Sequence, residues 1–351
     1  MSVFHQESKK TITGHSALRS ALRDTQTYSS DLQGDADVRD YRQLPLEVDP
    51  PRHHLYRSAL APYFVKPAIE KHVAQFRSNS ETLINKYFTS EPDEVVSDLA
   101  LPLVMQNLGV IYNRPHDVEE WISWGPDVWT AESKERDGKV LHRYIDRIYE
   151  EACEAKHSDI YHEIANLEIQ GVKISPMEFR GIVGVLLAGG RDTVVKLLTG
   201  IIWHFGRTDD LSKIRTGEIS ITSAIQEFLR FLSPLPLMNR TTVPETGTTN
   251  LPEDRYVGMS FISGNFDESV FENPHVINLN RARNPHLSFG FGPHTCLGNH
   301  IAEIEARVFL ETLKDCKFSW RLLEEKIRFH IHQRTFRHFN QDKYRSLRTR
   351  K

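Results

Sequence analysis

Apolar residues recur three and four positions apart along most of the chain, which is the pattern of amphipathic helices. This spacing predicts helices over residues 67–88, 117–129, 139–156, 219–232 and 299–313. Strand-like segments are short and cluster between Asn239 and Ile262. The chain is therefore predicted to be mainly α-helical, with small β-sheets.

The longest predicted helix covers residues 176–205 and has strong signals at its start. Ser175 fits the N-cap, a proline fills the first helical position, and Glu178 completes a capping box. Ile174 and Phe179 have the spacing of a hydrophobic staple. At ~1.5 Å per residue this helix is roughly 45 Å long, enough to cross a whole domain.

Residues 189–193 of this helix read Gly-Gly-Arg-Asp-Thr. Two adjacent glycines in a helix interior cost about 1 kcal/mol each relative to alanine, and they permit a kink or the close approach of a flat ligand. One interpretation is a contact between helices through small residues, with Asp192 and Thr193 in a polar patch. The other is a ligand-facing surface on which these two side chains take part in chemistry.

Residues 289–298 read FGFGPHTCLG, a glycine-rich turn that presents Cys296 just before a predicted helix. A cysteine at a helix N-terminus meets unpaired N–H groups and the positive end of the helix dipole, which both favour the thiolate. Thr295 stands where a dinucleotide-binding fingerprint needs its third glycine. The alternatives to a metal-binding thiolate are a small core residue and a partial zinc site with His294 and His300, for which a fourth ligand is not evident.

Charged side chains at helical spacing form two further patterns. His53 and Arg57 follow a helix-start signal, Asp-Pro-Pro, in which Asp49 is the expected N-cap. Two cationic donors on one helix face suit a pair of carboxylates, and the alternative is ordinary surface charge. Glu227 and Arg230 also share a helix face, and alone they indicate no more than an ion pair.

Composition excludes several classes of protein. The chain has 351 residues, 39% of them hydrophobic, and its net charge of −3 gives no sign of nucleic-acid binding. No window approaches the ~20 apolar residues of a membrane span, and the polar start lacks the apolar core of a signal peptide. Three widely spaced cysteines without a C-x-x-C pair fit a reducing compartment, so a soluble cytoplasmic protein is expected. We expect one domain over residues 1–351, with flexible ends at 1–16 and 340–351.

The motifs in this order and spacing resemble those of the cytochrome P-450 family, the haem-thiolate monooxygenases. Residues 289–298 fill every specified position of the family's F-G-x-G-x-H-x-C-L-G loop. Residues 189–193 fill its [A/G]-G-x-[D/E]-T pattern, residues 49–57 its D-P-P-x-H-x-x-x-R, and residues 227–230 its E-x-x-R. The resemblance runs from about Ala17 to Phe339 and implies the mainly α-helical P-450 fold.

The resemblance implies a role for each motif residue. Cys296 would be the axial ligand of the iron of haem b, with Phe289 packed near its sulfur. Asp192 and Thr193 would be the catalytic acid–alcohol pair that guides protons to oxygen at the iron. The two haem propionates would be held by His53, Arg57, Arg240 and His294.

The resemblance also implies an activity: one oxygen atom of O2 enters a small organic substrate, and the other leaves as water after two electrons and two protons arrive. Haem carries this chemistry, and thiolate ligation favours O–O cleavage. No flavin or nicotinamide fingerprint is visible, so a ferredoxin- or flavodoxin-type electron donor is implied. The alternatives are a haem-thiolate isomerase, dehydratase or peroxygenase, and a non-catalytic haem-binding protein.

In the family, substrate choice is set by the loop before the Asp49 helix, by the region that corresponds to residues 124–137, and by the central helix. Plausible apolar wall residues are Val185, Ala188, Leu235 and Leu237, which could equally be core.

Two regions depart from the family pattern. Only 48 residues precede Asp49, and the first helix pattern covers residues 16–23, so the family's first helix and first sheet strands are expected to be absent. The strand at residues 240–243 would then lack a neighbour and leave an exposed sheet edge. Residues 265–274, NFDESVFENP, resemble the family's N-R-D-P-x-x-F-x-x-P but differ at its second and fourth positions. Arg281 lies where the family supplies a third partner to the E-x-x-R pair.

Overall fold

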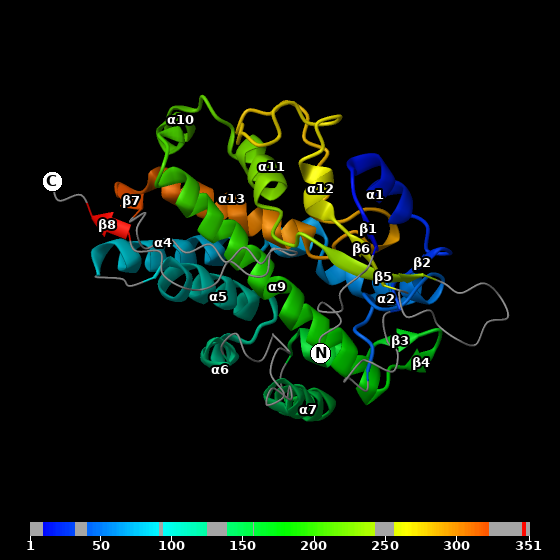
Figure 1. The fold of residues 1–351 in the computed structure, drawn as a ribbon. Helices are drawn as coiled ribbons and strands as arrows, with labels where there is room; N and C mark the ends of the chain where they lie inside the picture. The colour runs from blue at the N-terminus through cyan, green and yellow to red at the C-terminus, as the bar shows by residue number, and fades with distance from the viewer. Residues whose placement is uncertain are drawn as a thin grey trace.

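The long helix α9 (Pro176–Phe205) crosses the middle of the molecule, and other helices pack around it (Figure 1). The computed structural model describes residues 10–31, 41–90, 94–124, 139–156, 158–242, 256–322 and 346–348. Within these residues helices predominate and the strands are short, as the sequence predicts.

The start of α9 forms the predicted capping box. The hydroxyl of Ser175 accepts a hydrogen bond from the N–H of Glu178, and the Glu178 carboxylate accepts one from the N–H of Ser175. These bonds satisfy N–H groups that a helix start leaves unpaired. Ile174 and Phe179 are both buried, and the helix ends at Phe205, as expected, with Gly206 as its C-cap.

The predicted helices are present with shifted bounds. The pattern over 67–88 forms two helices, α3 (Lys66–Glu70) and α4 (Val73–Thr89). The pattern over 117–129 forms α6 (Val118–Ser123), and its residues 125–129 lie outside the described part. The remaining helices are α1 (His15–Ala21), α2 (Arg52–Leu60), α5 (Leu101–Ile111), α7 (Lys139–Cys153), α8 (Ile160–Ala165), α10 (Asp210–Thr216), α11 (Ile221–Leu232), α12 (Phe261–Asn265) and α13 (Asn299–Asp315). Short 3₁₀ or π-helical turns cover Ala61–Tyr63, Val96–Ala100, Pro115–Asp117 and Gly292–His294.

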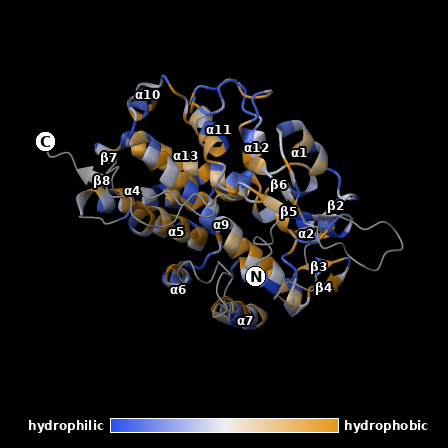
Figure 2. Cartoon of the chain, in the orientation of Figure 1, coloured by the Kyte–Doolittle hydropathy of each residue, from blue (hydrophilic) through white to orange (hydrophobic). Residues whose placement is uncertain are grey.

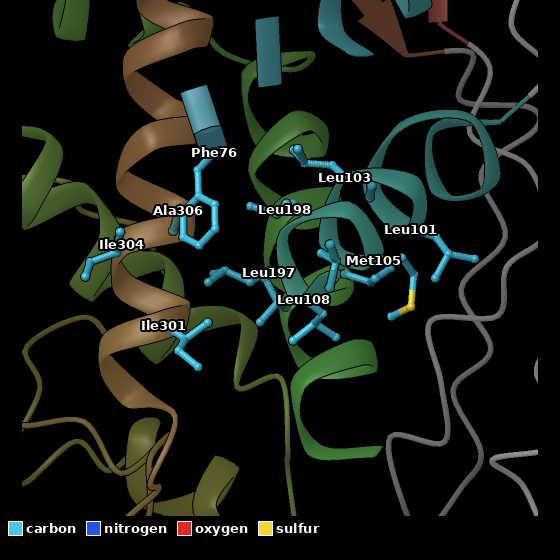
Figure 3. Packing of buried hydrophobic residues seen from close by; sticks show 14 of the residues in the cluster. Phe76, Leu101, Leu103, Met105, Leu108, Leu197, Leu198, Ile301, Ile304 and Ala306 are labelled. Atoms are coloured by element: carbon cyan, nitrogen blue, oxygen red, sulfur yellow. The ribbon is translucent and has the colours of Figure 1, made fainter. Parts of the chain in front are cut away.

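The main core lies between α4, α5, α9 and α13, whose apolar faces meet as Figure 3 shows. Phe76, Leu198, Ile304 and Ala306 are almost completely buried there. Figure 2 shows the apolar residues of these helices beside polar ones, which is the amphipathic pattern expected of helices around one core. Because α9 and α13 are part of this core, their positions relative to each other are set by close packing.

A small sheet lies beside the helices, with strand order β1-β6-β5-β2 (Figure 1). Strand β5 (Met238–Thr242) pairs antiparallel with β6 (Tyr256–Met259) and with β2 (Tyr28–Ser29), and β1 (Lys10–Ile12) pairs parallel with β6. The expectation that the strand at Arg240 lacks a neighbour is therefore wrong. Two strands from before Asp49 pair with the two outer edges of the β5–β6 pair, β1 along β6 and β2 along β5.

Two hairpins complete the strands: β3 (Glu168–Ile169) pairs with β4 (Val172–Lys173), and β7 (Trp320–Leu322) pairs with β8 (Ser346–Arg348). Strand β1 lies within the stretch expected as a flexible start, and β8 lies within the expected flexible end. Within the described residues, no helix is both long enough and apolar enough to cross a membrane.

The start of α2 differs from the prediction. Asp49 does not cap the helix: Pro51 takes the N-cap position and no side chain caps the helix start. The Asp49 carboxylate instead accepts hydrogen bonds from the N–H of Ser30, at 2.9 Å, and from the hydroxyl of Ser29. It therefore ties the end of β2 to the start of α2.

Candidate active site

The glycine-rich turn before α13 has the form that its sequence predicts. Gly290 and Gly292 have φ values of +70° and +77°, a region in which side chains other than glycine are strained. A Cβ on Gly292 would lie 2.8 Å from the carbonyl oxygen of Leu22, so glycine is also required there by space. The turn closes through a 2.8 Å hydrogen bond from the N–H of Cys296 to the carbonyl of Phe289.

Cys296 lies two residues before Gly298, the N-cap of α13. Its side chain is accessible, yet protein atoms surround it on the other sides. This burial raises the pKa of Cys296, and the opposing effects of the Gly298 N–H and the Arg57 charge are smaller. The helix terminus therefore assists the thiolate, but alone it does not overcome desolvation.

The other two cysteines lie elsewhere: Cys153 ends α7 and is exposed, and Cys316 follows α13 and is half-buried. The zinc alternative gains no support. The Nε2 atom of His294 is bonded to a serine, and His300 lies 3.9 Å from the Glu303 carboxylate. Within the described residues, no three His, Cys, Asp or Glu side chains are placed to hold a metal ion.

Four cationic or potentially cationic side chains predicted to act together lie close in space: His53, Arg57, Arg240 and His294. The rings of His53 and His294 lie 4.1 Å apart, and both side chains are buried. Burial, followed by the neighbouring positive charges, lowers the pKa of His53 to about 4 and that of His294 to about 2. Burial likewise lowers the pKa of Arg240 to about 10.

Within the described residues, the carboxylate of Asp49 supplies negative charge to this cluster. Its charge raises the pKa of His53 and of Arg240, against the larger effect of burial. Neither ring nitrogen of His53 has a hydrogen-bond partner within the described part of the chain, although both nitrogens are buried. A buried polar group without a partner is costly, so this cluster is suited to an anionic ligand.

The open face of α9 carries the predicted acid–alcohol pair. A Cβ on Gly189 would meet nothing within 4 Å, and both Asp192 and Thr193 lie within one helical turn of it, half-buried. The hydroxyl of Thr193 donates to the carbonyl of Gly189 at 3.0 Å. A Cβ on Gly190, by contrast, would lie 3.1 Å from the Leu108 side chain of α5, so the second glycine serves helix packing. The interpretation as a contact between helices is therefore supported for Gly190, whereas the chemical role of Asp192 and Thr193 stays a prediction.

Two further cations, which belong to none of the sequence motifs' predicted roles, accompany the pair. Arg191 is buried and donates to a carboxylate oxygen of Asp192 at 2.7 Å. Lys196, one turn after Asp192, donates to the carbonyl of Pro234 at 3.2 Å, and burial lowers the pKa of its ammonium. The sequence does contain a signal for these two residues, because charged side chains are unusual inside an otherwise apolar helix.

The E-x-x-R pair forms the expected buried cluster with Arg281. The Glu227 carboxylate accepts hydrogen bonds from Arg230 at 2.8 and 2.9 Å and from Arg281 at 2.9 Å. Arg230 and Glu227 are completely buried. Arg230 also donates to the carbonyls of Asn265 and Pro274, so the cluster fixes the segment that departs from the family pattern.

That departure has a structural explanation at one position. The ring of Phe266 packs on the guanidinium of Arg230, with the guanidinium carbon 5.3 Å from the ring centroid. A cation over an aromatic face is attracted to it. Asp267 accepts a hydrogen bond from the N–H of His15 and so connects this segment to α1. Nothing in the structure explains Glu268.

Phe289 and the predicted wall residues are half-buried. Phe289 is half-buried, packs against the main core and contacts the ring of His286. Val185, Ala188, Leu235 and Leu237 are half-buried. Residues 125–137, most of the region expected to set substrate choice, lie outside the described part of the chain.

Comparison with known proteins gives consistent matches. The family model described as "Cytochrome P450" matches residues 220–333. A steroid C26-monooxygenase of Mycolicibacterium smegmatis is 28% identical over 280 residues, which are 76% of this chain and 70% of that protein. The putative cytochrome P450 YjiB of Bacillus subtilis is 25% identical over 330 residues, 89% of this chain and 80% of its own. The solved structure of a carbohydrate active P450 is similar over 98% of this chain and 92% of its own, with 30% identity and a TM-score of 0.83.

Proposed function

Because the chain belongs to the cytochrome P450 family, whose members are haem-b-binding monooxygenases, we propose that it inserts one oxygen atom of O2 into a small organic substrate. The observation that carries the proposal is the cluster of His53, Arg57, Arg240 and His294 beside Cys296. This cluster of arginine and histidine hydrogen-bond donors next to a thiol suits a ligand that has both an iron atom and carboxylates.

The residues present fit haem on two grounds. The unpartnered nitrogens of His53 and the excess positive charge over Asp49 call for an anion that two propionates would supply. The thiol of Cys296, whose pKa is raised by burial, becomes a thiolate readily only when a cation binds it, as iron would. When bound, haem supplies the iron and porphyrin that activate O2.

The chain's own contribution to catalysis is proton delivery from α9. Since the Thr193 hydroxyl donates its hydrogen to the Gly189 carbonyl, its lone pairs remain as acceptors for a water or a substrate group on the open face. One oxygen of Asp192 is held by Arg191, so the other oxygen can accept a proton from water and pass it on towards Thr193. General acid–base assistance of this kind contributes typically ~100- to 10,000-fold.

Electrons are proposed to come from a separate ferredoxin- or flavodoxin-type protein, because the chain carries no flavin or nicotinamide fingerprint. A cytoplasmic location is part of the same proposal and rests on the cysteine usage of the sequence.

For the substrate class we propose a carbohydrate. The solved structure of a carbohydrate active P450 is 30% identical and similar over nearly the whole chain, whereas the steroid C26-monooxygenase is 28% identical over 76% of it. The open face of α9 also carries Asp192 and Thr193, which can hydrogen-bond to hydroxyl groups.

The testing experiment compares three conditions with purified holoprotein: NAD(P)H with surrogate redox partners, hydrogen peroxide alone, and neither. A panel of sugar derivatives and steroids is first screened for a shift of the haem spectrum. Product formation from a sugar only with NAD(P)H, O2 and redox partners supports the proposal. Turnover with peroxide alone indicates a peroxygenase, turnover with neither indicates an isomerase or dehydratase, and shifts only with steroids overturn the substrate class.

A further inference from the structure

Ser30 contacts His294 although the two residues come from opposite ends of the chain. Ser30 follows β2, is 1% exposed, and its hydroxyl oxygen lies 3.0 Å from the Nε2 atom of His294. The side chain of His294 is likewise buried. The contact therefore joins the N-terminal part of the sheet to the cysteine loop, inside the protein.

Asp49 holds Ser30 in this position. Its carboxylate accepts a hydrogen bond from the N–H of Ser30 at 2.9 Å and another from the hydroxyl of Ser29. The same carboxylate lies 4.0 Å from His294 Nε2, beyond hydrogen-bond distance. The direct contact of His294 on this side is thus the serine hydroxyl, while Asp49 fixes the backbone that carries it.

A serine hydroxyl can either donate to an imidazole nitrogen or accept from it, and the choice decides the tautomer of the ring. In the neutral ring one nitrogen carries the N–H and the other accepts, and because Ser30 occupies Nε2, Nδ1 is the nitrogen left to face a ligand. A carboxylate only accepts hydrogen bonds. For His294 to bind one, the N–H must be on the ring nitrogen that faces the carboxylate, and the other nitrogen must be an acceptor.

We propose that Ser30 is a positioning residue for haem binding: its O–H donates to Nε2 of His294 and thereby keeps the ring's one proton on Nδ1, as a donor for a propionate. This inference rests on the proposed function, in which His294 serves the haem carboxylates. In metal sites a hydrogen-bond partner on the second ring nitrogen orients the ligating histidine in a comparable way.

The test uses full-length holoprotein labelled with ¹⁵N-histidine, in the diamagnetic ferrous–carbon monoxide state. Two-bond ¹⁵N–¹H correlations identify the tautomer of each ring, and the His294 signals are assigned by their loss in His294→Gln. The wild type is expected to show the Nδ1–H form at His294. In Ser30→Ala that form should give way to a mixture, and Ser30→Thr, which keeps the hydroxyl, should restore it.

Haem transfer to apomyoglobin provides a second measurement. Ser30→Ala should lose haem ~5-fold faster, the factor expected for one buried hydrogen bond of about 1 kcal/mol, and Ser30→Thr should lose it at the wild-type rate. Thr312→Val is the matched control, because it removes a buried hydroxyl bond on α13, to the Val308 carbonyl. It should lower thermal stability without changing haem loss or the His294 tautomer.

The possible failures are distinguishable. A wild type that binds haem but has the Nε2–H tautomer at His294 overturns this inference alone, as does Ser30→Ala with both the tautomer and haem loss unchanged. A wild type that binds no haem overturns the proposed function and this inference together. If Ser30→Ala does not fold, the tautomer of His294 in the wild type still decides whether the inference stands.

Discussion

The ring of His53 lies 4.1 Å from the ring of His294, centroid to centroid, and both side chains are buried. One belongs to α2 and the other to the loop before α13, so the contact exists only in the folded chain. Arg57 and Arg240 lie near the same rings, and their positive charges help to lower the pKa of His294. Enclosing the positive charges of Arg57 and Arg240 beside two buried histidines costs free energy, which a bound anion would offset.

Removing the two arginines should weaken haem retention. Charge-assisted hydrogen bonds are worth ~1.5–3 kcal/mol each, so Arg57→Ala or Arg240→Ala should speed haem transfer to apomyoglobin by roughly 10- to 100-fold. The thiolate spectrum of the remaining holoprotein should be unchanged. Arg180→Ala, which removes an arginine paired with Asp146 on α7, is the control and should have no effect. Wild-type haem retention in the double variant would contradict the assignment.

Cys296 should be the iron ligand. Reduced wild-type protein with carbon monoxide should show the red-shifted Soret band of thiolate-ligated haem. Cys296→Ala should abolish this band, because no other cysteine lies in the loop before α13. The variants Cys153→Ala and Cys316→Ala are matched controls and should keep it. Survival of the band in Cys296→Ala would show that another group binds the iron.

Thr193→Ala should bind haem and substrate normally yet divert electrons from product into hydrogen peroxide. The variant loses the hydroxyl that sits beside Gly189 on the open face of α9, and with it one step of proton delivery. The measurement is product formed per NAD(P)H consumed, with peroxide quantified in parallel. Thr199→Ala, on the same helix but buried in the core, is the control. An unchanged product ratio in Thr193→Ala would mean that protons arrive by another route.

Glu227→Gln should destabilise the fold severely. The change leaves Arg230 and Arg281 without their shared carboxylate, and breaking a buried ion pair costs about 3–5 kcal/mol. Chemical denaturation measures the loss, and Glu218→Gln at an exposed position is the control. A difference of less than about 1 kcal/mol between the two variants would argue that the cluster does not brace the fold.

The same carboxylate predicts an acid dependence of stability. Burial by itself would raise the pKa of Glu227, but hydrogen bonds from Arg230, Arg281 and the N–H of Asn278 outweigh it and lower the pKa below its ordinary 4.5. A lowered folded pKa gives stability that is present above pH 4.5 and lost as the pH falls through the folded value. Unfolding free energy of the wild type should therefore fall below about pH 4.5, and Glu227→Gln should lose this part of the dependence.

Glu305 on α13 should show the opposite dependence. It is 2% exposed, neither carboxyl oxygen has a hydrogen bond of good geometry within the described residues, and Asn107 lowers its pKa only slightly. Burial raises the pKa of Glu305 to about 8. Its folded form is therefore neutral, and stability should decline as the pH rises from about 4.5 to about 8, while the unfolded state ionises.

Glu305→Gln, which cannot ionise, should therefore raise the unfolding free energy at pH 8 by roughly 1–3 kcal/mol and have little effect at pH 4.5. Urea denaturation at the two pH values measures this difference. Glu303→Gln, two residues away and partly exposed, is the control. Equal effects of Glu305→Gln at both pH values would show that the buried carboxyl does not titrate in this range.

The sequence by itself determined the local features of this protein. The capping box at Ser175, the glycine-rich turn before Cys296 and the side-chain spacing of Glu227 and Arg230 depend on residues a few positions apart. Steric limits on the backbone and hydrogen bonds within a turn of helix decide such features, so a local pattern is enough to predict them. The resemblance to a family then connected these segments into one predicted site.

Only the tertiary structure decided the contacts between distant segments. The sequence placed Asp49 as a helix cap, yet its carboxylate binds Ser30 and Ser29, because β2 folds back against the start of α2. It left β5 with an open edge, yet β2, from before Asp49, pairs with that edge. The burial of Arg191 and Glu305 likewise follows from the packing of α9 and α13 against their neighbours. Burial and long-range pairing depend on how whole elements pack, and periodicity along one chain does not encode which charged side chain becomes enclosed.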